Sequence, residues 1–249
     1  MTLDPRTPVL VGSGQFQHHA ASVADGIDPV TLMCEAIGLA VADAGLTSLD
    51  RVDSIRVVSS LSWKYGNPAL IIAEQRHMVS GEFAVTPMGG NSPQSLVNRT
   101  ALQILAGELD IVVLTGGESW RTRMRAKKEG IELDWPHAPD LSVPVVIGDE
   151  LVMNHPSEVA RNIVMPVQVY PMFETAIRAA AGRTVDEQLV RISELWARFS
   201  EVAARNPNAW TREARSADEI RTVTPDNRMI GLPYPKYMNS NNDVDMAAA

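Results

Sequence analysis

The sequence has little of what several protein classes require. Its single cysteine, Cys34, excludes a disulfide framework and a cysteine-based zinc site. No run of 18 apolar residues is present, which excludes a transmembrane helix of ordinary length. Basic residues are outnumbered by acidic ones, 22 against 30, and the net charge of −8 argues against a general nucleic-acid binder. The first residues lack a basic start followed by an apolar stretch, so we predict no signal peptide and a cytoplasmic location.

Short β-branched segments alternate with amphipathic ones in the first half of the chain. The predicted strands cover residues 8–11, 55–58, 83–85 and 111–114. The predicted helices cover residues 28–45, 68–79 and 92–107. This order is typical of an α/β fold with a mostly parallel sheet flanked by helices.

Apolar spacing assigns the buried faces of these helices. The first helix begins with the N-cap Asp28, and Cys34 lies on its apolar stripe, so we expect a packed thiol rather than a nucleophile. The helix that starts at Ser92 is predicted to turn four residues inward: Val97, Ala101, Ile104 and Leu105.

The second half has a different composition. Six prolines between residues 133 and 171 predict an irregular excursion over the core. A capping box at residues 184–187 opens a helix with six predicted inward residues: Leu189, Ile192, Leu195, Trp196, Phe199 and Val202. Residues 242–249 resemble the start of a further helix, so we expect a truncated chain.

A strand–turn–helix junction at residues 83–95 is the strongest candidate site. Exposed amides at a helix N-terminus favour an anion or a developing oxyanion, and nucleophiles are often mounted on such turns. In the plainer interpretation, Gly89 and Gly90 only let the chain bend and Ser92 only caps the helix.

Residues 90–97 and 106–119 resemble the thiolase superfamily. In that family the nucleophilic cysteine opens a helix, the helix ends in an Ala-Gly-x-x-Asp turn, and the next strand ends in Gly-Gly-x-Glu-Ser. The spacing here matches without a gap, and residues 8–12, 172–176 and 239–249 also fit. The resemblance covers the family's N-terminal half and loop domain.

The resemblance implies a thiolase-like α/β layer of alternating strands and helices, with the C-terminal half absent. It assigns residues 1–120 to an N-terminal core domain and residues 121–238 to a mainly helical or irregular loop domain that covers the substrate. Residues 239–249 would start the truncated C-terminal half. The implied function is an acyl-CoA-binding protein of lipid metabolism, with acyl transfer of the acetyl-CoA C-acyltransferase type as the family activity. Such a chain is expected to form a homo-oligomer or to bind a partner subunit.

The resemblance also implies roles for particular residues. Gly90 stands at the position of the nucleophilic cysteine, where no thioester can form. Met172 matches a residue that packs against the pantetheine arm of coenzyme A, and Phe173 replaces a glycine of that pocket. Asn239 matches the family, and Asn241 stands where a serine contacts pantetheine. Coenzyme A or an acyl-CoA is then the substrate, and no covalently bound cofactor is expected.

Three alternatives remain open. The chain could be a non-catalytic relative that binds acyl-CoA or a partner subunit. Its helix-terminus amides could stabilise an enolate without covalent capture, as in a retro-aldol cleavage or a decarboxylation. It could also be a serine hydrolase that uses Ser92 with His137 or His155 as base, although Pro93 removes an N–H that an oxyanion hole would use.

Two further patterns have plain interpretations. Gly12-Ser13-Gly14 has a dinucleotide-binding spacing but lacks the third glycine, so a simple turn is predicted. The basic residues between Arg121 and Lys128 could attract coenzyme A phosphates or form a solvated face or subunit contact. The histidines have no ligand spacing, so no metal site is predicted.

Overall fold

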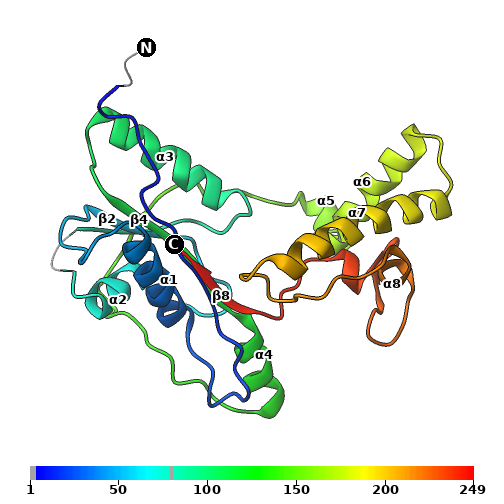
Figure 1. Ribbon diagram of the computed structural model, residues 1–249, viewed down its shortest axis with the longest axis horizontal. Coiled ribbons are helices and arrows are strands. Elements are labelled where there is room, and N and C mark those ends of the chain that lie inside the picture. Colours follow the sequence, from blue (N-terminus) through cyan, green and yellow to red (C-terminus); the bar gives the residue numbers. More distant parts are fainter. Residues whose placement is uncertain (1–3, 79–80) are drawn as a thin grey trace. The chain divides into compact units, whose positions relative to one another are not determined.

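In the computed structural model, which describes residues 4–78 and 81–249, three of the four predicted strand segments, those near residues 55, 83 and 111, become strands of one sheet (Figure 1). Its six strands are β1 (Gln15–Gln17), β2 (Ser54–Val57), β3 (Glu82–Val85), β4 (Val112–Ser119), β5 (Val145–Val146) and β8 (Asp245–Ala248). They lie in the order β1-β8-β4-β2-β3-β5. β2 runs parallel to β3 and β4, whereas β8 is antiparallel to both of its neighbours. The predicted mostly parallel α/β sheet is confirmed.

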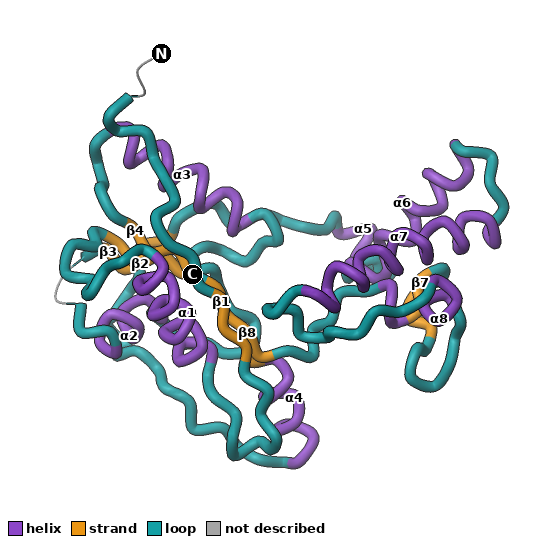
Figure 2. The backbone as a smooth tube through the Cα atoms, viewed as in Figure 1, coloured by secondary structure: helices purple, strands orange, loops and turns teal. Residues whose placement is uncertain are grey.

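Strand alternation places helices on both faces of this sheet. The helices are α1 (Pro29–Asp43), α2 (Pro68–Gln75), α3 (Ser92–Ala106) and α4 (Trp120–Glu129). Ile55 and Val57 point into the core formed with α1 and α2. Arg56 points to the opposite face, where its guanidinium bonds to Thr100 of α3. Figure 2 shows the same arrangement, with α3 on one side of the strands and α1 and α2 on the other.

The helix ends follow the predicted capping chemistry. Asp28 accepts hydrogen bonds from the backbone N–H groups of Val30 and Thr31 at the start of α1. Gly107 ends α3 in the left-handed region, with φ of 80°. α2 ends at Gln75, short of the predicted end at residue 79, and His77 just beyond it has a positive φ of 57°. Val79 itself lies outside the described residues.

Two predictions about the chain's ends are wrong. Residues 8–11 form no strand, and Val9, Leu10 and Val11 are exposed. The last residues form the strand β8 rather than a helix, because the backbone between β1 and β4 offers hydrogen bonds on both sides. Tertiary pairing therefore overrides the helical propensity of an alanine-rich segment.

The predicted inward face of α3 is also wrong in part. Leu96 and Thr100 are buried, whereas Val97 and Leu105 are exposed. The buried stripe is therefore rotated by about one residue from the predicted one.

The chain divides into two compact units, residues 1–151 with 242–249, and residues 152–241. The second unit is mainly helical and contains α5 (Pro156–Val159), α6 (Pro166–Ala180), α7 (Val185–Arg205) and α8 (Ala217–Arg221), with a short hairpin of β6 (Met229–Gly231) and β7 (Tyr234–Pro235) and the turn η1 (Lys236–Met238). The first unit therefore extends to residue 151, whereas the resemblance assigns the core domain to residues 1–120. Among the described residues, no helix is both long and apolar enough to cross a membrane.

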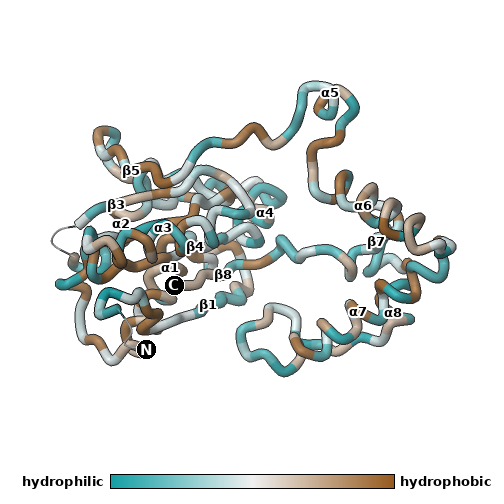
Figure 3. The backbone as a smooth tube through the Cα atoms, turned by 90° about the horizontal axis from the view of Figure 1, so that it is seen from above, coloured by the Kyte–Doolittle hydropathy of each residue, from teal (hydrophilic) through white to brown (hydrophobic). Residues whose placement is uncertain are grey.

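The second unit has a small core around Ile192, Ile220 and Met238. The predicted capping box of α7 is confirmed, since Thr184 and Glu187 bond each other reciprocally. Ile192 faces inward as predicted. Three other residues of the predicted inward face are exposed: Leu195, Phe199 and Val202. Apolar and polar residues alternate along α6 and α7 in Figure 3.

Candidate functional site

The carboxyl ends of β2, β3 and β4 meet at one edge of the sheet because these strands are parallel. That edge is where open α/β sheets bind ligands. It carries the loop at residues 58–67, the bend at residues 86–91, and the end of β4.

Serine hydroxyls join these three segments. Ser59 donates its hydroxyl proton to the Thr86 carbonyl, and it donates its backbone N–H to Thr86 Oγ1 at 3.3 Å. Ser60 Oγ donates to the carbonyl of Gly117 at 2.7 Å. The loop therefore holds the bend and the end of β4 in fixed register.

Glu118 fixes the other end of this loop. Its carboxylate accepts hydrogen bonds from the N–H groups of Leu61, at 2.5 Å, and Ser62, at 2.8 Å. Ser62 Oγ in turn accepts from the N–H of Ser119 at 3.0 Å. The Glu118 carboxylate therefore stabilises the loop at residues 61–62 through these hydrogen bonds.

Gly90 lies at the bend with open space beside it. A Cβ built on Gly90 would meet no heavy atom within 4 Å, and its φ lies outside the left-handed region. By contrast, a Cβ on Gly89 would lie 2.8 Å from Asn91 Oδ1. A side chain at position 90 is therefore sterically allowed, and the glycine there is not required by the backbone.

Ser92 begins α3 and is buried. Its hydroxyl donates to the Pro87 carbonyl at 3.0 Å, and its N–H donates to the Gly89 carbonyl at 3.0 Å. The N-cap residue is Asn91, which makes no side-chain capping bond. Ser92 therefore closes the bend instead of capping the helix.

The candidate bases for Ser92 have other partners. The ring of His137 packs against Trp63 at 5.1 Å between centroids. His155 lies in the second unit, where its Nδ1 is 2.7 Å from Ser157 Oγ. These contacts give the hydrolase alternative no support.

Exposed apolar side chains border the bend. Leu61 is 58% exposed, Met88 52% and Val146 61%. The segment that carries Val146 lies next to the bend, because Ile147 donates its N–H to the Val85 carbonyl and a Cβ on Gly148 would contact Pro87 at 3.4 Å. The rim of the candidate site is therefore apolar.

Cys34 is not available as a replacement nucleophile. It is buried in the core of α1, and its Sγ donates to Gln75 Oε1 at 3.2 Å. Burial raises the pKa of this thiol to about 12. The predicted packed thiol is confirmed.

The residues that the resemblance assigned to acyl-CoA binding lie in the second unit or at its end. Met172 and Phe173 are exposed on α6. Asn239 donates its side-chain amide to the Pro235 carbonyl at 2.8 Å, and Asn241 is exposed. Their role in binding stays a prediction.

The basic residues of α4 are largely engaged within the first unit. Arg121 pairs with Asp243, Arg123 donates to the Leu61 carbonyl, and Arg125 donates to two carbonyls of the loop at residues 20–21. These bonds favour a structural role over phosphate binding.

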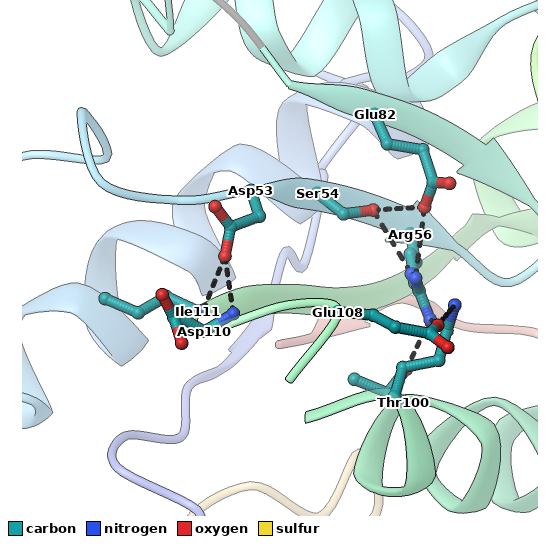
Figure 4. A network of polar contacts seen from close by, with 9 residues as sticks. Asp53, Ser54, Arg56, Glu82, Thr100, Glu108, Asp110 and Ile111 are labelled. Carbon is teal, nitrogen blue, oxygen red and sulfur yellow. Dashed lines mark hydrogen bonds and ion pairs between the residues drawn. The ribbon is translucent and has the colours of Figure 1, made fainter. Parts of the chain in front are cut away.

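Sequence reasoning missed a buried polar network on the α3 face of the sheet, shown in Figure 4. Arg56 is 1% exposed, and its guanidinium bonds to Thr100, Gln103 and Glu82. The polar residue between Ile55 and Val57 was the available signal, because alternation turns it away from the α1 face.

A scan against protein-family models and a search of curated proteins gave no match. Among solved structures, the chain is similar to a monomeric SCP2-thiolase-like protein type 1 from Mycobacterium smegmatis, with 29% identity and a TM-score of 0.76 over 99% of this chain and 46% of that one. It is also similar to an Ltp2-ChsH2(DUF35) aldolase, with 17% identity and a TM-score of 0.62 over 98% of this chain and 55% of that one.

A third similar structure is an acetyl-CoA acetyltransferase from Syntrophomonas wolfei, with 16% identity and a TM-score of 0.52 over 96% of this chain and 63% of that one. The last two likenesses concern the fold alone. The chain spans about half the length of the first two proteins. Among the described residues, no group of three or more His, Cys, Asp or Glu could hold a metal ion.

Proposed function

We propose that this chain, which has the thiolase-superfamily fold, binds an acyl-CoA non-covalently at the bend around Gly90. The observation that carries the proposal is the open space beside Gly90. The sequence resemblance assigns this position to the family's acyl-accepting cysteine. The thioester end of the ligand would lie at the carboxyl edge of the sheet, beside the apolar rim of Leu61, Met88 and Val146.

Covalent acyl transfer of the family type needs a thiolate at this bend. Gly90 has no side chain, and the only cysteine is buried with a raised pKa. We therefore propose that the chain acts in acyl-CoA metabolism without a cysteine-bound acyl intermediate, either as a binding subunit or as part of an enzyme that uses other chemistry.

A calorimetric titration of the protein with acetyl-CoA and with free coenzyme A tests the binding proposal. Saturable heat with acetyl-CoA is expected. The matched variants are Gly90→Leu, which fills the space at the bend and should weaken binding at least tenfold, and Gly90→Ala, which should not. Absence of heat with both ligands would count against the proposal.

Replacing Gly90 by cysteine tests the position itself. Because the site has room for a side chain, Gly90→Cys should give one thiol that reacts rapidly with a disulfide reagent, while Cys34 of the unaltered protein stays unreactive. Incubation with acetyl-CoA should then move the acetyl group from the coenzyme A sulfur to the new thiol of the variant only, with release of free coenzyme A. An unreactive thiol at position 90 would show that the bend does not face a ligand site.

A second candidate is cleavage of a carbon–carbon bond, which the Ltp2-ChsH2(DUF35) aldolase favours as a similar structure. In a retro-aldol step, the hydroxyl proton of a β-hydroxyacyl-CoA leaves to a base and the Cα–Cβ bond breaks. A carbonyl compound is released, and the enolate of the shorter acyl-CoA takes up a proton. Stabilising this enolate requires donors but no nucleophile.

Assays separate the remaining alternatives. Release of an aldehyde or ketone from a β-hydroxyacyl-CoA would support the aldolase candidate. Thiolysis of acetoacetyl-CoA that a cysteine reagent blocks would contradict the non-covalent proposal. Labelling by a fluorophosphonate probe that is lost in Ser92→Ala would instead support the hydrolase alternative.

A further inference from the structure

The face of α3 that lies on the sheet is largely polar. Within α3, all of which the structure describes, the buried residues are Ser92, Leu96 and Thr100, and Leu96 is the only apolar one. It belongs to a small apolar cluster with Ala84 of β3. Gln103, three residues beyond Thr100, lies on the same side of the helix. This contact therefore contains little apolar packing.

Apolar packing alone does not fix where such a helix lies along a sheet. The hydrophobic effect is non-directional and depends on the area that is buried. A hydrogen bond, in contrast, is strong only over a narrow range of distance and angle. Directional bonds from the sheet to the buried face of α3 therefore set the position of this helix along the strands.

Those bonds come from Arg56 of β2, whose guanidinium is buried beneath α3 (Figure 4). Its Nη1 donates to Thr100 Oγ1 and to Gln103 Oε1, each at 2.8 Å. The other donors bond to the sheet itself, Nε to Ser54 Oγ and Nη2 to Glu82 Oε1, both at 3.1 Å. Because the guanidinium is planar and rigid, these bonds fix α3 against β2 and β3 together.

The opposite end of this stripe closes the bend that carries Gly90. The Ser92 hydroxyl donates to the Pro87 carbonyl and the Ser92 N–H donates to the Gly89 carbonyl, both at 3.0 Å. Thr100 lies about two helical turns from Ser92, and the rise of an α-helix is fixed by its backbone hydrogen bonds. A shift of α3 at Thr100 therefore moves Ser92 and the bend with it.

We infer that Arg56 is a positioning residue for the ligand site at the bend around Gly90. It acts through α3, because the guanidinium holds Thr100 and Gln103 in register with the sheet and the helix in turn holds Ser92. The inference rests on the proposed acyl-CoA site and deepens it, since it names the group that sets the width of the space beside Gly90.

A matched pair of substitutions on α3 tests the bond to Arg56. Thr100→Val removes the hydroxyl that accepts from the guanidinium, whereas Thr100→Ser keeps it. Thr100→Val should speed amide hydrogen exchange at Ser92 and Ser95, whose N–H groups bond to Gly89 and Asn91, at least tenfold. It should also weaken acetyl-CoA binding at least fivefold in a calorimetric titration, and Thr100→Ser should do neither.

Arg56→Met is the second variant, since an apolar side chain of similar length can replace a buried ion without unfolding a protein. It should have the same two effects at the bend as Thr100→Val. Ile72→Val, in the core on the other face of the sheet, controls for a general loss of stability and should leave both measurements unchanged.

Each outcome decides one of the two proposals. Faster exchange at the bend in Ile72→Val as well would overturn the positioning role, because it would then reflect general destabilisation. Unchanged exchange in both Thr100→Val and Arg56→Met, or faster exchange with unaltered acetyl-CoA affinity, would overturn that role too. Absence of acetyl-CoA binding in the unaltered protein would contradict the proposed function alone, since the exchange data would still show whether Arg56 positions the bend.

Discussion

At the scale of single residues, the buried guanidinium of Arg56 forms an ion pair with the carboxylate of Glu82. Glu82→Gln should lower the free energy of unfolding by about 2 to 3 kcal/mol, because it leaves a guanidinium that is 1% exposed without its counter-charge. Glu82 is itself 34% exposed, so the loss should fall short of that for a fully buried pair.

Asp110→Asn is the matched control for this change. Asp110 pairs with Arg6 at a similar distance, 3.0 Å, but its side chain is 77% exposed, so the loss should stay below about 1 kcal/mol. Urea unfolding at pH 7 measures both variants. Equal losses would show that the Arg56 network contributes no more than a surface ion pair.

Cys34 predicts how stability changes at alkaline pH. Burial raises its pKa from 9.0 to about 12, so the folded protein keeps the thiol proton above pH 9 while the unfolded chain loses it. This contribution is fully present below pH 9 and is lost progressively as the pH rises towards 12. Between pH 8 and pH 10 the loss should be about 1 kcal/mol.

The difference between the unaltered protein and Cys34→Ala isolates this contribution. Tyrosines titrate in both proteins and cancel, including Tyr65, whose pKa burial also raises. Unfolding curves at pH 8 and pH 10 should therefore converge for the two proteins as the pH rises. A difference that does not change with pH would contradict the shifted thiol.

How far the sequence could identify the candidate site also differs by residue. The apolar stripe of α1 predicts the packed Cys34, because that stripe is a local pattern. The strand–turn–helix pattern marks the bend at Gly90, and only the resemblance to the thiolase superfamily gives that position a role. The bonds of Ser92 to Pro87 and of Glu118 to the loop at residues 61–62 could not be predicted, since they depend on how loops from different strands meet at the sheet edge.

At the scale of elements, close packing of the N-terminal segment on α1 requires glycine. A Cβ on Gly14 would lie 2.1 Å from the Ala36 carbonyl oxygen, and one on Gly12 would lie 2.2 Å from that of Ala40. Gly14→Ala should therefore cost at least about 2 kcal/mol of unfolding free energy, because neither backbone can yield without breaking the β1–β8 pairing.

Gly90→Ala serves as the control, since its Cβ meets open space, and it should change stability by less than about 0.5 kcal/mol. Thermal unfolding of both variants gives the comparison. A Gly14→Ala protein as stable as Gly90→Ala would show that the segment is free to move away from α1.

The same packing explains which elements the sequence predicts. α1 could be predicted because the N-cap residue Asp28 and the apolar stripe that follows it both indicate a helix over the same segment. The glycines at positions 12 and 14 resemble a nucleotide-binding turn, but they serve the approach to α1. β8 could not be predicted, because alanines specify a strand only when β1 and β4 flank them.

At the scale of the whole molecule, both units expose large apolar side chains. On α3 these include Leu102 and Leu105, and on α6 they include Tyr170, Phe173 and Ile177. Faces of this kind usually contact another chain or domain. The isolated 249-residue chain should therefore dimerise or aggregate at micromolar concentration, with a sedimentation coefficient that rises with concentration.

Charges placed on the exposed face of α3 should oppose this association, since they must lose hydration when the face is covered. Leu102→Glu combined with Leu105→Glu should shift the protein towards monomer by at least tenfold in dissociation constant, whereas Val223→Glu, at an exposed loop position of the second unit, should leave it unchanged. Sedimentation velocity over a hundredfold range of concentration measures the shift. Monomeric behaviour of the unaltered chain with one cooperative melting transition would contradict the prediction, because these faces would then be tolerated in water.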